Sequence, residues 1–254
     1  MKVGLLGFGK TGKAVASILL QSEEVKLQWV IRKSHNLEHR SVPEFLGISS
    51  TEPGFIYSTE EFSAHEILRK LPVDVIIDFS SEGGVEYYGE EARKQKIAIV
   101  SAISNYSSDK IEHLKYLSEK TQVVWSPNIT IGINFLIIAA KILKKIAPYV
   151  DVEILEEHFK AKPEVSGTAK KIAEALDLPE ESIKTLRAGG IIGVHEILFG
   201  FPYQTVRLKH ESITREAFGN GVLFAARHIS DKEVGMYSME DLLMPYFNAG
   251  AKVQ

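Results

Sequence analysis

The sequence predicts an α/β protein in two parts: a Rossmann-like, doubly wound parallel sheet at the N-terminus and an α+β domain with an open mixed sheet after it. Three observations support this prediction. Short β-rich runs alternate with helical patterns over the first half, a GFGKTG turn follows the first run, and successive strand patterns replace the alternation in the second half. Parallel neighbours need crossover connections, so strand–helix alternation is typical of a parallel sheet with helices on both faces.

The composition is that of a globular protein without a strongly charged surface. The 254 residues are 44% hydrophobic and 25% charged, enough for a substantial core, and the formal net charge is -3. That charge gives no basic field, so we expect neither a nucleic-acid nor a membrane partner. The chain has no cysteine, which excludes disulfides and thiolate metal sites, and its histidines show no metal-ligand spacing. We expect a cytoplasmic protein with a small-molecule partner and no metal.

Two apolar segments could suggest targeting or membrane insertion. The N-terminal run, MKVGLLGFGKTGKAV, is interrupted by glycines and lysines, unlike the continuous apolar region of a signal peptide. The stretch from Ile133 to Ala147 is too short before its lysines to span a bilayer. The first segment therefore predicts mature sequence, and the second predicts a buried helix with a basic end.

The β-rich runs of the first half are separated by stretches long enough for helices. Each intervening stretch is polar on one side, as expected of a helix that packs on a sheet. The runs lie at residues 2–7, 26–31, 73–79, 97–102 and 121–126. We expect residues 1–127 to form a dinucleotide-binding domain, joined by a C-terminal segment at about 231–254, and residues 128–230 to form a substrate-binding and oligomerisation domain.

The GFGKTG turn has the context that a dinucleotide site requires, because it follows a strand and opens a helix. Gly7 permits the tight turn, Gly9 lets the backbone approach a pyrophosphate, and Gly12 lets the helix pack closely on the strand. The free N–H groups at the helix N-terminus would bind the phosphates. The alternative is a purely structural glycine turn. The candidate cofactor residues here are Gly7, Phe8, Gly9, Lys10, Thr11 and Gly12.

The end of the second strand bears on the choice of cofactor. An NAD site usually places Asp or Glu there to hold the ribose 2′-hydroxyl, whereas this chain has Arg32 and Lys33. Two cations suit a 2′-phosphate, so NADPH is favoured and NADH remains possible. The alternative is that both are solvated charges.

Two further strand ends point to the same crevice, since ligands of such sheets lie at the carboxyl ends of the strands. Phe79 follows the third strong strand, and Ser101, Ala102 and Ile103 follow the next. Taken alone, each segment is more often an ordinary βα loop. Within this fold we expect them to contact the nicotinamide end of a cofactor.

The second half has a different pattern. A long apolar helix precedes an alternating strand at 150–158, a helix follows at about 168–176, and two later strands form a hairpin around 200–204. A helix interrupted or started near Gly219–Gly221, and a short closing helix in MEDLLMPYF, complete the chain. The apolar face of the open sheet could pack against a symmetry mate.

The stretch HFKAKPEVSGTAKK combines cations with a helix start. An extended backbone would put His158, Lys160 and Lys162 on one face, Pro163 would stop regular pairing, and Ser166 would open a helix. A cationic face beside a helix N-terminus suits an anion. The alternative is that Lys160, Lys170 and Lys171 are solvent charges and Ser166 is only an N-cap, which we favour for those lysines but not for His158 and Lys162.

These residues resemble a known family. VEILEEHFKAKPEVSGTA is similar to the signature of the 4-hydroxy-tetrahydrodipicolinate reductase (dihydrodipicolinate reductase) family. The resemblance extends in order through VGLLGFGKTG, DVIIDFSSEGG, SPNITIGIN, RAGGIIGVHEILFG and MEDLL, and so covers nearly the whole chain.

The resemblance implies hydride transfer from NAD(P)H to C4 of a cyclic imine dicarboxylate, giving tetrahydrodipicolinate in lysine and diaminopimelate biosynthesis. It implies that His158 is the proton donor or acceptor and that Lys162 is the second catalytic cation. It also implies a homotetramer built through the sheet of the second domain. The substrate-binding residues would be Phe159, Ser166, Gly167 and Thr168, and the SPNITIGIN segment would add Ser126, Asn128 and Ile129 to the cofactor site.

The chain departs from the family pattern at four places. The glycine turn, GFGKTG, lacks one residue of the common form. Phe159 stands where many members have a second histidine, the KPEVSGT loop is one residue shorter than usual, and residues 101–104 replace a usual Gly-Thr-Thr-Gly. His195 could have a structural role or a substrate role. Two alternative functions stay open: a related two-domain NADP-dependent amino-acid dehydrogenase, and a catalytically silent nucleotide-binding protein.

Overall fold

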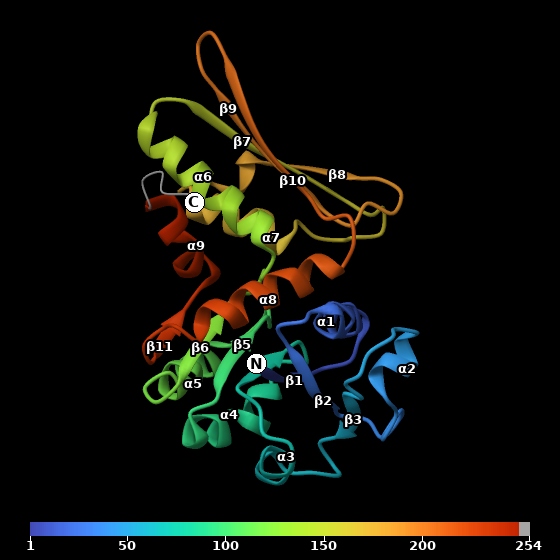
Figure 1. The fold of residues 1–254 in the computed structure, drawn as a ribbon. Coiled ribbons are helices and arrows are strands. Elements are labelled where there is room, and N and C mark those ends of the chain that lie inside the picture. The colour runs from blue at the N-terminus through green and yellow to red at the C-terminus, as the bar shows by residue number, and fades with distance from the viewer. Residues whose placement is uncertain (249–254) are drawn as a thin grey trace. The chain divides into compact units, whose positions relative to one another are not determined.

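The alternating first half folds into a seven-stranded sheet in which every neighbouring pair is parallel, with the order β11-β6-β5-β4-β1-β2-β3. The structure is a computed structural model that describes residues 1–248, and it confirms the predicted Rossmann-like sheet (Figure 1). The strands are β1 Lys2–Leu6, β2 Lys26–Arg32, β3 Phe55–Ser58, β4 Val75–Asp78, β5 Ala98–Ser101, β6 Gln122–Trp125 and β11 Gly235–Tyr237.

Helices cover both faces of this sheet, as a parallel sheet requires. The helices α3, α4 and α5 pack on one face, over a core that includes Trp29, Ile76 and Ile99, whereas α1 and α8 lie against the other (Figure 1). The helices of this part are α1 Lys10–Gln21, α2 Val42–Leu46, α3 Ala64–Lys70, α4 Gly84–Gln95, α5 Ser108–Leu117, α8 Glu216–Ile229 and α9 Met239–Asn248.

The chain divides into two compact units whose limits differ from the predicted boundaries. The first unit comprises residues 1–130 and the residues from Phe218 onward, and the second comprises Ile131–Ala217. Residues 218–230 thus fall in the first unit, because Val222, Ala225 and Ile229 of α8 are fully buried in its core. The last six residues of the predicted C-terminal segment, 249–254, lie outside the described residues.

The helix predicted to break or start near Gly219–Gly221 is instead continuous from Glu216 to Ile229. The two glycines serve close packing. A Cβ on Gly221 would lie 1.9 Å from the carbonyl oxygen of Ile129, and one on Gly219 would lie 2.6 Å from Cβ of Ile18. Glycine lowers helix propensity by about 1 kcal/mol, which tertiary packing overrides here.

The second unit is a mixed four-stranded sheet with two helices on one face, as predicted. Its order is β10-β9-β7-β8; β7 and β8 are parallel, and the other two pairs are antiparallel. The elements are α6 Ile131–Ile146, β7 Asp151–His158, α7 Gly167–Ala175, a 3-10 turn at Glu180–Ser182, β8 Ile183–Arg187, β9 Val194–Gly200 and β10 Thr205–Glu211. The expected hairpin joins β9 to β10.

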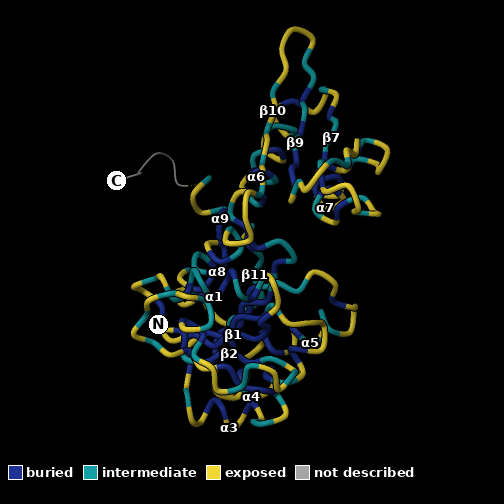
Figure 2. The backbone as a smooth tube through the Cα atoms, turned by 90° about the vertical axis from the view of Figure 1, so that its right-hand side faces the viewer, coloured by how far each residue is buried: buried dark blue, intermediate teal, exposed yellow. Residues whose placement is uncertain are grey.

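One face of this sheet forms the core of the second unit and the other is open. Ile154, Ile197 and Phe199 are fully buried beneath α6 and α7. Alternate residues face the other way, and β10 accordingly alternates between intermediate and exposed positions (Figure 2). Leu198 and the ion pair between Arg207 and Glu196 belong to this open face.

Three strands were not predicted: β3, β8 and β11. Each is an edge strand, and two of them have only three or four residues, too few for a clear alternation of apolar and polar side chains. Within residues 1–248 there is also no helix with the length and apolar character needed to cross a membrane.

Candidate active site

A cleft of about 800 Å³ lies at the carboxyl ends of β1, β2, β3 and β4 in the first unit. This is the edge at which open parallel sheets bind ligands. The predicted residues that line it are Gly7, Phe8, Gly9, Arg32, Lys33 and Phe79. Sequence reasoning missed Ser34, Thr59, Ser80, Ser81, Glu86 and Tyr87, which also line it. The first four come shortly after strand ends, which was the available signal, whereas Glu86 and Tyr87 lie in the first turns of α4 and had no such signal.

The glycine turn lines this cleft with its backbone. Gly7 has φ +94, and a Cβ there would lie 2.5 Å from the carbonyl oxygen of Phe79, so only glycine fits. Gly9 is the N-cap of α1 and provides no side-chain cap, which leaves N–H groups of the first turn directed at the cleft. Such a helix N-terminus attracts phosphate.

The other residues predicted for the cofactor do not line this cleft. Gly12 is buried behind Gly7, where a Cβ would lie 2.2 Å from the Gly7 carbonyl oxygen, and Lys10 and Thr11 lie in the first turn of α1. Ser101 is the last residue of β5, and Ala102 and Ile103 follow it. Ser126, Asn128 and Ile129 follow β6. Ile129 is fully buried and Ser101 bonds to Tyr106 at 2.9 Å.

The two cations at the end of β2 differ in exposure: Arg32 is partly buried and Lys33 is exposed. Arg32 donates from Nη1 to the carbonyl oxygen of Asn36 at 3.0 Å. Beside it, His35 lies between Glu38, at 2.8 Å, and Glu60. The hydrogen bonds to Glu38 and then Glu60 raise the pKa of His35 above its usual value.

A buried carboxylate underlies the cleft and was not predicted. Asp78, the last residue of β4, is fully buried, and it accepts hydrogen bonds from the Ser80 amide at 2.8 Å, the Ser80 hydroxyl at 2.6 Å and the Tyr88 hydroxyl at 2.9 Å. Burial raises the pKa of Asp78 to about 6, although these hydrogen bonds oppose the shift.

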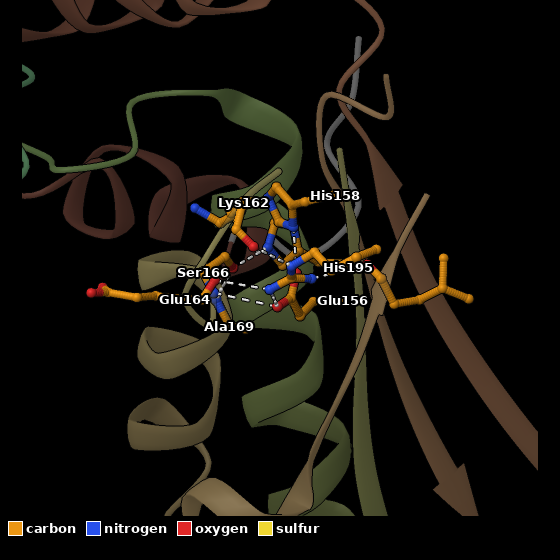
Figure 3. A network of polar contacts seen from close by, with 9 residues as sticks. Glu156, His158, Lys162, Glu164, Ser166, Ala169 and His195 are labelled. Atoms are coloured by element: carbon orange, nitrogen blue, oxygen red, sulfur yellow. Dashed lines mark hydrogen bonds and ion pairs between the residues drawn. The ribbon is translucent and has the colours of Figure 1, made fainter. Parts of the chain in front are cut away.

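In the second unit, β7 presents two ionisable residues on its buried side. The strand alternates in burial, so Glu156 and His158 point to the same side as the core residues Val152 and Ile154. Glu156 bonds through Oε2 to Nδ1 of His158, and its Oε1 accepts from Nη2 of Arg187 at 2.6 Å. Figure 3 shows this network, with the Glu164 side chain directed away from it.

A second histidine lies next to this network. Ser166 is the N-cap of α7: its Oγ accepts from the Ala169 amide at 2.9 Å and lies 2.8 Å from Nε2 of His195. The rings of His158 and His195 meet edge to face, with centroids 5.4 Å apart. His195 is therefore part of the site, which sequence reasoning left undecided between a structural and a substrate role.

Burial and charge set the protonation of these groups. Burial alone would raise the pKa of Glu156, but hydrogen bonds from Arg187 and His158 outweigh it and lower that pKa. Burial lowers the pKa of His158, the Glu156 carboxylate opposes this, and the charges of Lys162 and Arg187 add to the lowering. Burial lowers the pKa of His195 to about 3. At neutral pH, Glu156 is ionised and His195 is neutral.

The expected extended face of His158, Lys160 and Lys162 is wrong. The strand ends at His158 and the chain turns, with the Lys162 amide donating to the Phe159 carbonyl at 3.0 Å. Lys162 still lies at the site, because its carbonyl oxygen accepts from Nε of Arg187 at 3.1 Å. Lys160 is exposed, and Lys170 pairs with Glu180 at 2.8 Å.

The other predicted substrate residues border the same network. Gly167 is the first residue of α7 and is exposed, with no heavy atom within 4 Å of where a Cβ would lie. Thr168 follows it in the first turn of the helix, and Phe159, at the turn, is 43% exposed. In this network, sequence reasoning missed Glu156 and Arg187. The signal for Glu156 was its place two residues before His158 on one strand.

Family models match both parts of the chain. The model described as dihydrodipicolinate reductase, N-terminus, matches residues 1–129, and the one described as dihydrodipicolinate reductase, C-terminus, matches residues 129–243.

Curated relatives and solved structures agree with this match. A 4-hydroxy-tetrahydrodipicolinate reductase of Caldanaerobacter subterraneus is 33% identical over 72% of this chain and 82% of the relative. One of Syntrophus aciditrophicus is 29% identical over 93% of this chain and 96% of the relative. The fold is similar to that of dipicolinate-bound dihydrodipicolinate reductase from Paenisporosarcina sp. TG-14, with a TM-score of 0.75, 21% identity, and coverage of 94% of this chain and 97% of that one. The chain therefore belongs to the dihydrodipicolinate reductase family of oxidoreductases.

Proposed function

We propose that this protein catalyses the NAD(P)H-dependent reduction of 4-hydroxy-tetrahydrodipicolinate, or the dihydrodipicolinate formed from it, to tetrahydrodipicolinate in lysine and diaminopimelate biosynthesis, in the cytoplasm. One observation carries the proposal. His158, Lys162 and the N-terminus of α7 surround one small region of the second unit, where a dicarboxylate would meet a cation, backbone N–H groups and a proton carrier. Family membership supplies the class of reaction.

The cofactor would be held by the first unit. The backbone of Gly7 and Gly9 and the N-terminus of α1 suit its pyrophosphate, and Phe79 lines the same cleft. When bound, the nicotinamide supplies the hydride that is added to C4 of the imine. Arg32 and Lys33 favour a 2′-phosphate, so NADPH is the preferred cofactor and NADH a second one.

The substrate would be held and protonated by the second unit. Gly167 and Thr168 bind one carboxylate through the first turn of α7, with Ser166 fixing that turn, and Lys162 binds the other carboxylate. Addition of hydride leaves electron density on an enamine, which the Lys162 cation stabilises. His158 exchanges the proton that completes the reduction. Phe159 would border the ring of the substrate, at the position where many family members have a histidine.

The subunits would assemble as a homotetramer through the open face of the second unit's sheet. That face combines Leu198 with charged side chains such as Arg207 and Glu196. Interfaces between subunits likewise contain both apolar and polar side chains.

The test is a steady-state assay of NADPH and NADH oxidation with the cyclic imine generated from pyruvate and aspartate semialdehyde. We expect oxidation only when the imine is present, with a higher kcat/KM for NADPH. No oxidation of either cofactor would refute the proposed function. Reduction of NADP by an open-chain amino acid instead would identify the chain as an amino-acid dehydrogenase, and ligand binding without turnover would identify a silent binding protein.

A further inference from the structure

Glu156 is a fully buried carboxylate between two partners of different chemistry. Its side chain has 0% exposure, and the side chains of His158 and Arg187 beside it have 10% and 19%. A buried carboxylate is costly unless its oxygens are satisfied, and both are: Oε2 by His158, and Oε1 by Arg187 and, at 3.4 Å, by the Ser166 amide.

We propose that Glu156, locked by Arg187, is the positioning residue that keeps His158 in the Nδ1-protonated tautomer and leaves Nε2 to exchange the proton of the reaction. The inference rests on the proposed function. An ionised carboxylate only accepts hydrogen bonds, so the histidine Nδ1 facing it carries the hydrogen. In the neutral ring, Nε2 then has the lone pair.

The surroundings of Nε2 fit this assignment. A Cβ on Gly193 would lie 3.1 Å from Nε2, so glycine at this position keeps a side chain away from that nitrogen. The charged or titratable groups that face His158 are Glu156 on its own strand, Arg187 on β8, His195 on β9 and Lys162 on the following loop. Of these, Glu156 is the one that stabilises the protonated ring.

Arg187 connects the carboxylate to the loop that carries the second catalytic residue. Its Nη2 donates to Glu156 and, at 2.8 Å, to the carbonyl oxygen of Glu164, while its Nε donates to that of Lys162. A guanidinium has donors only and a fixed planar shape. It therefore holds both the orientation of the Glu156 carboxylate and the position of Lys162 relative to His158.

This arrangement makes Glu156→Gln a sharp test. Arg187 would take the amide oxygen of the glutamine, which turns the NH₂ group toward His158. Nδ1 would then have to accept, and the hydrogen would move to Nε2. Glutamine has nearly the same volume as glutamate, so the variant leaves the packing unchanged. It would, however, reverse the tautomer of the His158 ring. Glu156→Asp keeps an acceptor-only group and should keep the tautomer.

The experiment combines ¹⁵N NMR of histidine-labelled full-length protein with steady-state kinetics on NADPH and the cyclic imine. The His158 signals are assigned by their loss in His158→Gln. We expect the Nδ1–H tautomer in the wild type and in Glu156→Asp, and the Nε2–H tautomer in Glu156→Gln. In Glu156→Gln, kcat should fall by about 10²-fold or more with a smaller change in KM, since general acid–base catalysis contributes about 10²–10⁴-fold. Its residual pH profile should shift to lower pH.

The matched control is Glu153→Gln, three residues earlier on the same strand, where the side chain is 44% exposed and pairs with Lys184 at 3.2 Å. It should leave the tautomer and kcat unchanged. Wild-type tautomer and kcat in Glu156→Gln would overturn the proposal, as would an Nε2–H tautomer in the wild type. If the tautomer changes as expected but no variant, nor the wild type, reduces the imine, the positioning role stands and the proposed function fails.

Discussion

The buried Asp78 makes a quantitative prediction about stability and pH. Its pKa is raised from 3.8 to about 6 because the side chain is buried. One pKa unit corresponds to about 1.4 kcal/mol, so the shift corresponds to about 3 kcal/mol of destabilisation when the group is ionised. The folded state binds the proton more tightly than the unfolded state. The free energy of unfolding therefore rises as the pH falls through about 6, and this gain is complete below the unfolded pKa of about 3.8.

Asp78→Asn removes this ionisation and keeps most of the hydrogen bonds. The amide oxygen can accept from the Ser80 amide and hydroxyl, and the NH₂ group can donate to the Tyr88 hydroxyl. We expect Asp78→Asn to be more stable than the wild type at neutral pH by up to about 3 kcal/mol, and the difference to shrink toward zero near pH 4.

The assay is chemical denaturation of both proteins across this pH range. Asp74→Asn, at the exposed residue just before the same strand, is the control for replacing a carboxylate, since its acceptor for the Lys2 amide is retained. A stability difference between Asp78→Asn and wild type that stays constant with pH would refute the assignment of a raised pKa to Asp78.

Three further predictions concern the cofactor, the chemistry and the packing. Arg32→Asp should weaken NADPH binding about 10-fold or more relative to NADH, because it replaces a partner of the 2′-phosphate by a like charge; equal effects in titrations with both cofactors would contradict a 2′-phosphate site. His158→Gln should lower kcat by about 10²–10⁴-fold while leaving cofactor affinity unchanged, and a kcat within a few-fold of wild type would remove His158 from the mechanism. Gly221→Ala should cost about 1–3 kcal/mol of stability because its Cβ would overlap the Ile129 carbonyl; Gly167→Ala, with open space around its Cβ, is the control in thermal unfolding, and equal melting temperatures would contradict the packing argument.

Periodicity predicted the long elements well and the short edge strands poorly. The alternation of Val152, Ile154, Glu156 and His158 is visible in the sequence and places all four on one side of β7. By contrast, β11 is three residues long, and its pairing with β6 spans more than a hundred residues of chain. Such pairing depends on tertiary contacts that no local pattern records.

The roles of individual glycines and charged residues were harder to predict from the sequence than the positions of apolar residues. Gly219 and Gly221 suggest a turn by propensity, yet they allow α8 to approach Ile18 and Ile129. The position of Lys162 was predicted from an extended backbone, whereas the structure places Lys162 at the site through a turn that begins at Phe159. Glu156 and Arg187 come together from separate strands, β7 and β8, so sequence spacing alone cannot pair them.

The second unit interrupts the first unit in the sequence, and this sets the order in which the two units can fold during synthesis. The parallel sheet of the first unit lacks the edge strand β11, and its core lacks α8, until residues beyond the second unit have left the ribosome. The second unit, by contrast, is one uninterrupted stretch of chain, so it can complete its sheet first. During synthesis the half that would bind the substrate is therefore finished before the half that would bind the nucleotide. A nascent chain stalled once Ala217 has emerged from the ribosome should resist proteolysis over residues 131–217 while the earlier residues stay cleavable.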